Sequence, residues 1–90
     1  MIDSMSKFMT VAATEVARYF NDHLNTSNED NRIYIEDVYC VWVCKTLQNF
    51  KGLFSTPIPD GMYYEITYNG DKDEMYLDAY KKWENKVIKM

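Results

Sequence analysis

The stretch "YYEITYNGDKDEMYLDAY", residues 63–80, gives the clearest structural signal in this chain, because alternating apolar and polar residues flank an Asn-Gly turn signal. It contains five of the chain's eight tyrosines. A four-residue loop, "NGDK", places Ile66 opposite Met75 and keeps apolar residues together on one face. A two-residue Asn-Gly loop would place Ile66 opposite Asp73 instead. The pattern therefore predicts a β-hairpin closed by the longer loop.

The two faces of this hairpin differ in polarity, since side chains alternate along a strand. One face is apolar and is expected in the core: Met62, Tyr64, Ile66, Met75, Leu77 and Ala79. The other face is mostly polar: Tyr63, Glu65, Thr67, Glu74, Tyr76 and Asp78. We therefore expect Tyr64 and Tyr68 to be buried, whereas Tyr63 and Tyr76 are free for another role.

A second hairpin is predicted upstream, where β-branched and aromatic residues predominate. One strand is expected from about Val38 to Leu47, and the next from about Gly52 to Thr56. Pro57 should end the second strand, because proline cannot donate a ladder hydrogen bond. The first strand is apolar on both faces, which is typical of a strand that is central or covered on both sides.

The two ends of the chain show helical spacing of apolar residues. Residues 6–24 predict an amphipathic helix, and the polar segment 25–32 predicts a loop. Near the other end, Tyr80, Trp83 and Val87 recur at helical spacing and predict a short C-terminal helix. The alternative is that the last strand continues to about Lys82.

These elements predict an α+β fold in a single domain, residues 1–90. An N-terminal amphipathic helix packs on a four-stranded antiparallel meander, and a short C-terminal helix follows. One helix covers one face of a small sheet, so the second apolar face needs the C-terminal helix or another subunit. A homodimer is the favoured arrangement, and a monomer enclosed between its two helices is the alternative.

Composition and charge narrow the class of protein. Hydrophobic residues make up 47% of the 90 residues, which is typical of a packed domain and not of a disordered segment. The net charge of −4 disfavours nucleic-acid binding, because such proteins neutralise phosphates with Lys and Arg. No apolar run approaches the roughly 20 residues of a membrane span, so we expect no membrane contact and a cytoplasmic location.

The residues that support catalysis or metal binding are sparse. Cys40 and Cys44 are too far apart along a strand to form a disulfide, and both are expected to be buried thiols. His23 is interpreted as a boundary histidine of the helix. The acidic cluster around Asp71 and Asp73 lacks the pattern of a calcium loop and is interpreted as a solvated turn. We therefore expect no enzyme activity, no cofactor and no metal.

The polar run "KTLQNFKG", residues 45–52, is a candidate protein-binding site at a hairpin tip. An exposed aromatic anchor with a polar rim is typical of a protein contact. The candidate partner-binding residues are Lys45, Gln48, Asn49, Phe50 and Lys51. The alternative is that Phe50 folds back onto the domain.

Aromatic residues and lysines in the second half suggest a second kind of site. An oligomer could hold a nucleotide-like signal by stacking its base on aromatic rings and contacting its phosphates with lysines. The candidate residues are Tyr63, Tyr76, Tyr80, Trp83, Lys72, Lys81 and Lys82. The same residues could bind single-stranded nucleic acid, a hypothesis that the net charge weakens.

Two blocks, "VCKTLQNFKGLFST" and "DGMYYEITYNGDKDEMYLDAYKKWENK", resemble a family of short uncharacterised proteins encoded by phages and prophages of Gram-positive bacteria. The resemblance covers roughly residues 34–88. It implies a small phage gene product in a bacterial cytoplasm, where many proteins of this size bind and block host factors. It assigns no activity and no role to any residue.

The favoured functional hypothesis is a non-enzymatic phage accessory protein that binds and blocks a host protein, as a defence or takeover factor. The alternative is an oligomeric sponge that sequesters a nucleotide-like immune signal. Single-stranded nucleic-acid binding is the second alternative.

Overall fold

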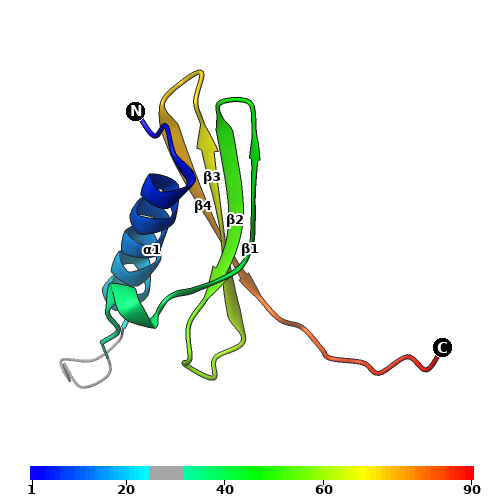
Figure 1. Cartoon of the computed structure of the whole chain (residues 1–90). Coiled ribbons are helices and arrows are strands. Elements are labelled where there is room, and N and C mark those ends of the chain that lie inside the picture. Colours follow the sequence, from blue (N-terminus) through cyan, green and yellow to red (C-terminus); the bar gives the residue numbers. More distant parts are fainter. Residues whose placement is uncertain (25–31) are drawn as a thin grey trace.

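The computed structural model describes residues 1–24 and 32–90. Its elements are α1 (Met5–Asp22), the short 3-10 helix η2 (Ile35–Asp37), β1 (Tyr39–Thr46), β2 (Asn49–Ser55), β3 (Met62–Asn69) and β4 (Glu74–Lys81). The four strands form one antiparallel sheet in the order β1-β2-β3-β4, and α1 lies against one face (Figure 1). The predicted α+β meander is confirmed. The predicted loop at 25–32 lies outside the described residues except for Arg32.

Helix α1 forms where the sequence supplies both a cap and an apolar stripe. The hydroxyl of Ser4 accepts a hydrogen bond from the backbone N–H of Lys7 at 3.1 Å, which satisfies one of the free donors at the helix start. Phe8, Ala12 and Val16 are fully buried and lie four residues apart, so they form one continuous face. Within the described residues, no helix combines the length and apolarity that a membrane crossing requires.

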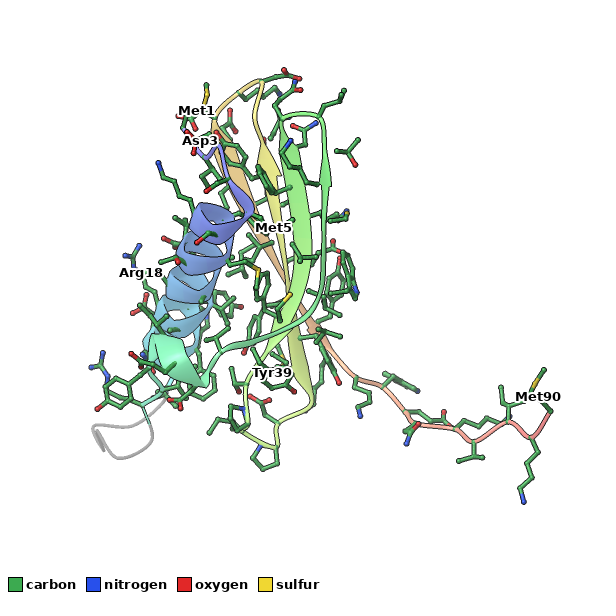
Figure 2. The ribbon with its side chains drawn as sticks, viewed as in Figure 1. Met1, Asp3, Met5, Arg18, Tyr39 and Met90 are labelled. Carbon is green, nitrogen blue, oxygen red and sulfur yellow. The ribbon has the colours of Figure 1, made fainter. Side chains whose placement is uncertain are left out.

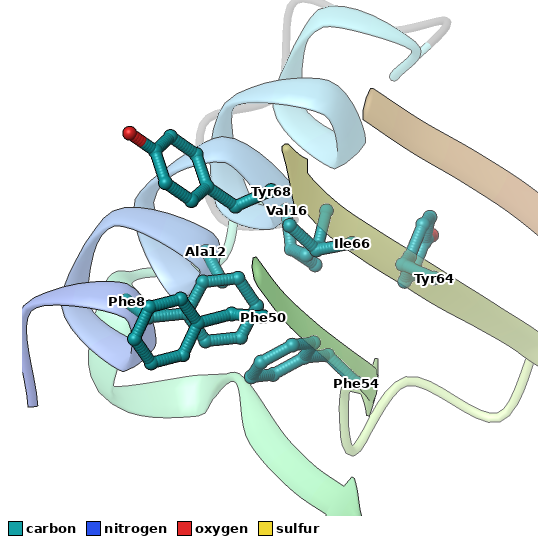
Figure 3. Close-up of a cluster of buried hydrophobic side chains, with 8 residues drawn as sticks. All are labelled: Phe8, Ala12, Val16, Phe50, Phe54, Tyr64, Ile66 and Tyr68. Carbon is teal, nitrogen blue, oxygen red and sulfur yellow. The ribbon is translucent and has the colours of Figure 1, made fainter. Parts of the chain in front are cut away.

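The core lies between α1 and the two central strands (Figure 3). The ring of Phe8 stacks on that of Phe50, with centroids 5.2 Å apart, and Phe54 packs beside them. Gly52 lies between Phe50 and Phe54 on β2, and a Cβ on this glycine would come within 2.8 Å of the Phe54 ring. The glycine therefore makes room for an aromatic side chain. The other core residues from the sheet are Tyr64, Ile66 and Tyr68.

The β3–β4 hairpin has the predicted faces but a different register. Ile66 pairs with Leu77 instead of Met75, a shift of two residues. Because side chains alternate with a period of two, this shift leaves each residue on its predicted face. Tyr64 and Tyr68 are buried, as predicted.

The shift arises at the loop, which consists of residues 70–73 instead of 69–72. Asn69 remains in the sheet and pairs with Glu74. The Asn69 side-chain oxygen accepts a hydrogen bond from the backbone N–H of Asp71 at 3.0 Å, and Asp73 adopts a positive φ of 52°. Asn and Asp tolerate these turn conformations better than other residues do. Turn chemistry therefore set the register.

Two predictions about the first hairpin are wrong. The second strand begins at Asn49 and not at Gly52, because a two-residue turn at Leu47 and Gln48 closes the hairpin. Leu47 adopts a positive φ of 56°, which the apolar sequence does not indicate. The first strand is also not central, since β1 lies at the edge of the sheet.

A bulge in β1 changes which of its residues lie on which face of the sheet. The register shifts between Cys40 and Trp42, so the regular alternation breaks at Val41. Cys40 and Val43 pack against the core, whereas Trp42 lies on the opposite side of the sheet. The expectation that both cysteines are buried is wrong for Cys44, which is exposed.

The predicted C-terminal helix is absent from the described structure, and the alternative of a longer last strand is confirmed. Strand β4 continues to Lys81, and the backbone N–H of Lys82 donates to the Gly61 carbonyl at 2.7 Å. Residues 82–90 contain neither helix nor strand and lead away from the sheet (Figure 1). A helix of so few residues is marginal in water unless another surface packs on it.

Candidate functional site

The face of the sheet opposite α1 is defined by the strand register. Paired residues project to the same side, so Trp42, Leu53, Glu65 and Asp78 form a row across all four strands. The neighbouring row toward α1 contains Val43, Gly52, Ile66 and Leu77. We use the term open face for the side away from α1. Its central members are Tyr39, Trp42, Cys44, Lys51, Leu53, Tyr63, Glu65, Thr67, Tyr76, Asp78 and Tyr80.

The open face contains five aromatic side chains, of which Tyr39, Trp42, Tyr76 and Tyr80 are exposed and Tyr63 is half-buried. Trp42 is 43% exposed and Tyr80 is 53% exposed, although both belong to ordered strands. Tyr63 and Tyr80 are direct cross-strand partners, and Leu53 lies beside Trp42 on the neighbouring strand. An aromatic and aliphatic surface therefore extends from β1 to β4.

Acidic groups outnumber basic ones on this face. Glu65, Glu74 and Asp78 contribute three carboxylates, and the ammonium of Lys51 lies 3.6 Å from Glu65. The hydroxyl of Tyr76 donates a hydrogen bond to Glu74 at 2.9 Å, and this bond raises the pKa of Tyr76. Negative charge therefore lies beside the apolar side chains of this face, which favours a partner with positive groups at matching positions.

The two cysteines lie on opposite sides of the sheet. Cys40 is half-buried beside the core, and burial raises the pKa of its thiol. Cys44 is exposed on the open face. A raised pKa lowers the thiolate fraction, so Cys40 has the environment of a structural residue and not of a nucleophile.

The predicted exposure of Phe50 at the hairpin tip is wrong, and the fold-back alternative holds. Phe50 is 1% exposed because β2 begins at Asn49, three residues before the predicted start, and the Phe50 ring stacks on Phe8. The ammonium of Lys45 lies 5.5 Å from the centre of the Phe50 ring and donates to the Leu47 carbonyl. Phe50 therefore anchors the core and presents no surface to a partner.

The remaining residues of that tip hold the two hairpin turns together. The Gln48 side chain donates to Asp71, and the Asn49 side-chain oxygen accepts from the backbone N–H of Gly70 at 2.8 Å. A Cβ on Gly70 would overlap the Gln48 carbonyl. Of the five predicted partner-binding residues, Asn49 and Lys51 lie on the side of the open face.

The predicted ligand-stacking residues separate into two groups. Tyr63, Tyr76 and Tyr80 lie together on the open face. The lysines do not converge there, since Lys72 lies in the β3–β4 turn whereas Lys81 and Lys82 lie at the opposite end of β4. An eight-residue strand spans about 26 Å, so these cations cannot contact one small phosphate group together. Trp83 lies beyond the strand and is 97% exposed.

Seven of the named members of the open face were not predicted as site residues, and those with large apolar or aromatic side chains are Tyr39, Trp42 and Leu53. Their common feature is that they continue the polar-face rows of the β3–β4 hairpin onto β2 and β1. Extending those rows from strand to strand would have identified Leu53 opposite Glu65. The bulge at Val41 would still have concealed the position of Tyr39 relative to Trp42.

Two surface hollows lie elsewhere. One, of about 290 Å³, lies between α1 and β4 and is lined by Val11, Met75 and Leu77 among others. The second, of about 360 Å³, lies at the end of α1, where the His23 ring stacks on Tyr19. Residues 1–24 and 32–90 contain no group of three His, Cys, Asp or Glu side chains with the arrangement of a metal site.

Comparison with known proteins identifies the family but no activity. A search of curated proteins and a search of solved structures each give no significant match. A family model described as a family of unknown function (DUF6275) matches residues 9–90, which include the whole sheet and most of α1. The predicted resemblance to an uncharacterised family is confirmed at this level, and the chain belongs to the DUF6275 family.

Proposed function

We propose that this protein is a non-enzymatic binding protein that binds another protein through the open face of its sheet. The observation that supports the proposal is the uncovered aromatic surface formed by Tyr39, Trp42, Tyr63, Tyr76 and Tyr80. Tyr and Trp are enriched in protein interfaces and provide a large share of binding energy where they are desolvated. A sheet face of this composition gains free energy when a second surface excludes water from it.

The polarity of the open face defines the chemistry of the partner. Its β1–β2 half requires an apolar surface that can pack against Trp42 and Leu53. Its β3–β4 half, with Glu65 and Asp78, favours lysine or arginine on the partner. We therefore propose a protein partner whose contact surface combines apolar side chains with positive charge.

The resemblance to phage-encoded proteins supports a narrower proposal, in which the target is a host protein that is blocked by being bound. A nucleotide sponge receives less support. Tyr63 and Tyr80 offer rings for stacking, but Glu65 and Asp78 lie beside them and would repel phosphate groups. Single-stranded nucleic acid meets the same obstacle.

Site-specific photo-crosslinking in the bacterial cytoplasm tests the proposal. A photoreactive amino acid replaces Leu53 at the centre of the open face, and a matched variant places it at Tyr34, which is 69% exposed but lies outside the sheet. We expect a discrete protein adduct from position 53 and none from position 34. Mass spectrometry identifies the protein in the adduct. The complex is then reconstituted from the two purified proteins without the crosslink.

In the reconstituted complex, Trp42→Ser should weaken binding at least about tenfold, because a central aromatic contributes roughly 2 kcal/mol or more. Tyr34→Ser serves as the control and should leave the affinity unchanged. The proposal is wrong if position 53 gives no protein adduct, or if Trp42→Ser binds as tightly as the original sequence.

A further inference from the structure

We infer that the partner of the open face is a second copy of this chain. The C-terminal segment of each copy crosses the open face of the other copy. The C-terminal segment is defined as residues 82–90. The inference rests on the proposed function, since it names the partner of the same face. A host protein that binds there would compete with the second copy.

The C-terminal segment has the apolar content of a buried segment but no cover within its own chain. Trp83, Val87 and Ile88 are among the most exposed large hydrophobic residues in the described part of the chain. Figure 2 shows the segment leading away from the sheet, with its side chains pointing into solvent. Burying such side chains removes apolar surface from water, so the segment gains stability from any matching surface.

The charges of the C-terminal segment complement those of the open face. The segment contains one acidic residue, Glu84, and three basic ones, Lys82, Lys86 and Lys89. The open face has the reverse balance, with three carboxylates and Lys51. The segment therefore has the combination that the open face requires, namely apolar side chains interspersed with positive charge.

The available area also favours an exchange between two copies. Four strands about 4.8 Å apart and about eight residues long present a face of about 500 Å². A stable interface buries about 800 Å² per partner, so the face alone is too small. Nine extended residues reach about 30 Å, which is about the length of these strands. A segment from each copy therefore enlarges the area that the two copies bury together.

Return of the segment onto its own sheet is disfavoured by the sequence after β4. The hydrogen bond from Lys82 to Gly61 keeps the chain in line with the strand at that point. Gly and Pro favour reversals, and residues 82–90 contain neither, with Asn85 as the single residue that favours turns. An extended segment that enters a second copy needs no reversal.

Sedimentation velocity with two complementary variants of the full chain tests the inference. The segment variant carries Trp83→Ser and Val87→Ser, and the face variant carries Trp42→Ser and Tyr80→Ser. We expect a dimer for the original sequence at micromolar concentration and monomers for each variant alone. An equal mixture of the two variants should form heterodimers, because one intact segment can still meet one intact face.

Several results would overturn the inference. They are a monomeric original sequence, a dimer that survives in either variant, and a mixture that remains monomeric. Circular dichroism controls for folding, and Tyr34→Ser controls for loss of an exposed aromatic elsewhere. If the chain is monomeric but position 53 crosslinks to a different protein, the inference fails while the proposed function stands. If position 53 crosslinks to no protein, both fail.

Discussion

The two faces of the sheet are built from the same four strands, but they differ in what covers them. Toward α1, Phe50 and Ile66 are almost completely buried. On the open face, Trp42 and Tyr80 also lie in strands but remain about half exposed. Aromatic residues in this domain therefore serve two purposes. On the covered face they stabilise the fold, and on the open face they are available for association.

The largest expected effect separates the two faces directly. Phe50→Ala removes a ring that stacks on Phe8 inside the core, so it should reduce the free energy of unfolding by about 3 to 5 kcal/mol. Urea denaturation followed by circular dichroism measures this loss. A loss below about 1 kcal/mol, within the range of ordinary surface substitutions, would show that Phe50 is not a core residue.

A smaller loss of stability is expected where the β1–β2 turn contacts the β3–β4 turn. This contact holds both faces in register. Gly70→Ala places a Cβ against the Gln48 carbonyl, and the backbone must shift to relieve the overlap. We expect a cost of about 1 to 3 kcal/mol in the same denaturation experiment. Lys72→Ala in the same turn is the control and should change stability by less than about 0.5 kcal/mol. Equal effects would mean that the turns are not tightly joined.

The covered face should also show a pH dependence that arises from its two buried tyrosines. A hydrogen bond to Asp73 raises the pKa of Tyr68, and burial raises the pKa of Tyr64. A raised pKa means that the folded state favours the protonated hydroxyl. This contribution is fully present below the pKa of an unfolded tyrosine, about 10, and is lost as the pH rises above it.

The urea midpoint should therefore fall between about pH 9 and pH 11. A variant with Tyr64→Phe and Tyr68→Phe should lose stability overall but show a shallower fall across the same range. Identical slopes in the two proteins would contradict the assignment of the pH dependence to the covered face.

The smallest expected effect on stability lies on the open face. Trp42→Ser removes a cross-strand contact with Leu53, which contributes less than about 1 kcal/mol. Its effect on association should be much larger than its effect on unfolding. Measuring both properties of this variant, at concentrations where the chain is monomeric and where it associates, sharpens the contrast with Phe50→Ala. A loss of stability comparable to that of Phe50→Ala would place Trp42 in the core.

Much of this fold follows from periodicity in the sequence. The spacing of Phe8, Ala12 and Val16 predicts the buried face of α1, and alternation predicts both faces of the β3–β4 hairpin. These predictions hold because helical and strand periodicity depends on nearby residues, and because burial in the core stabilises the apolar positions. The four-strand meander follows from the turn signals between apolar runs.

The errors arise where distant contacts or unusual backbone angles decide the structure. Phe50 is buried because Leu47 accepts a positive φ and Gln48 contacts a turn more than twenty residues away. The bulge at Val41 reverses the alternation of β1 without a sequence signal. The helical spacing of Trp83 and Val87 lacks a surface to pack on within the chain. The open face could thus be recognised in part from Tyr63 and Tyr76, but not at β1.

The strand order has a consequence for how the chain folds. Each strand pairs with its neighbour in sequence, through connections of two, six and four residues. Short connections close within microseconds, so the hairpins can form early, whereas docking of α1 requires contacts between distant segments. Until α1 docks, the sheet exposes aromatic residues on both sides. The interval between hairpin closure and helix docking is therefore the stage at which this chain is most prone to aggregate during synthesis.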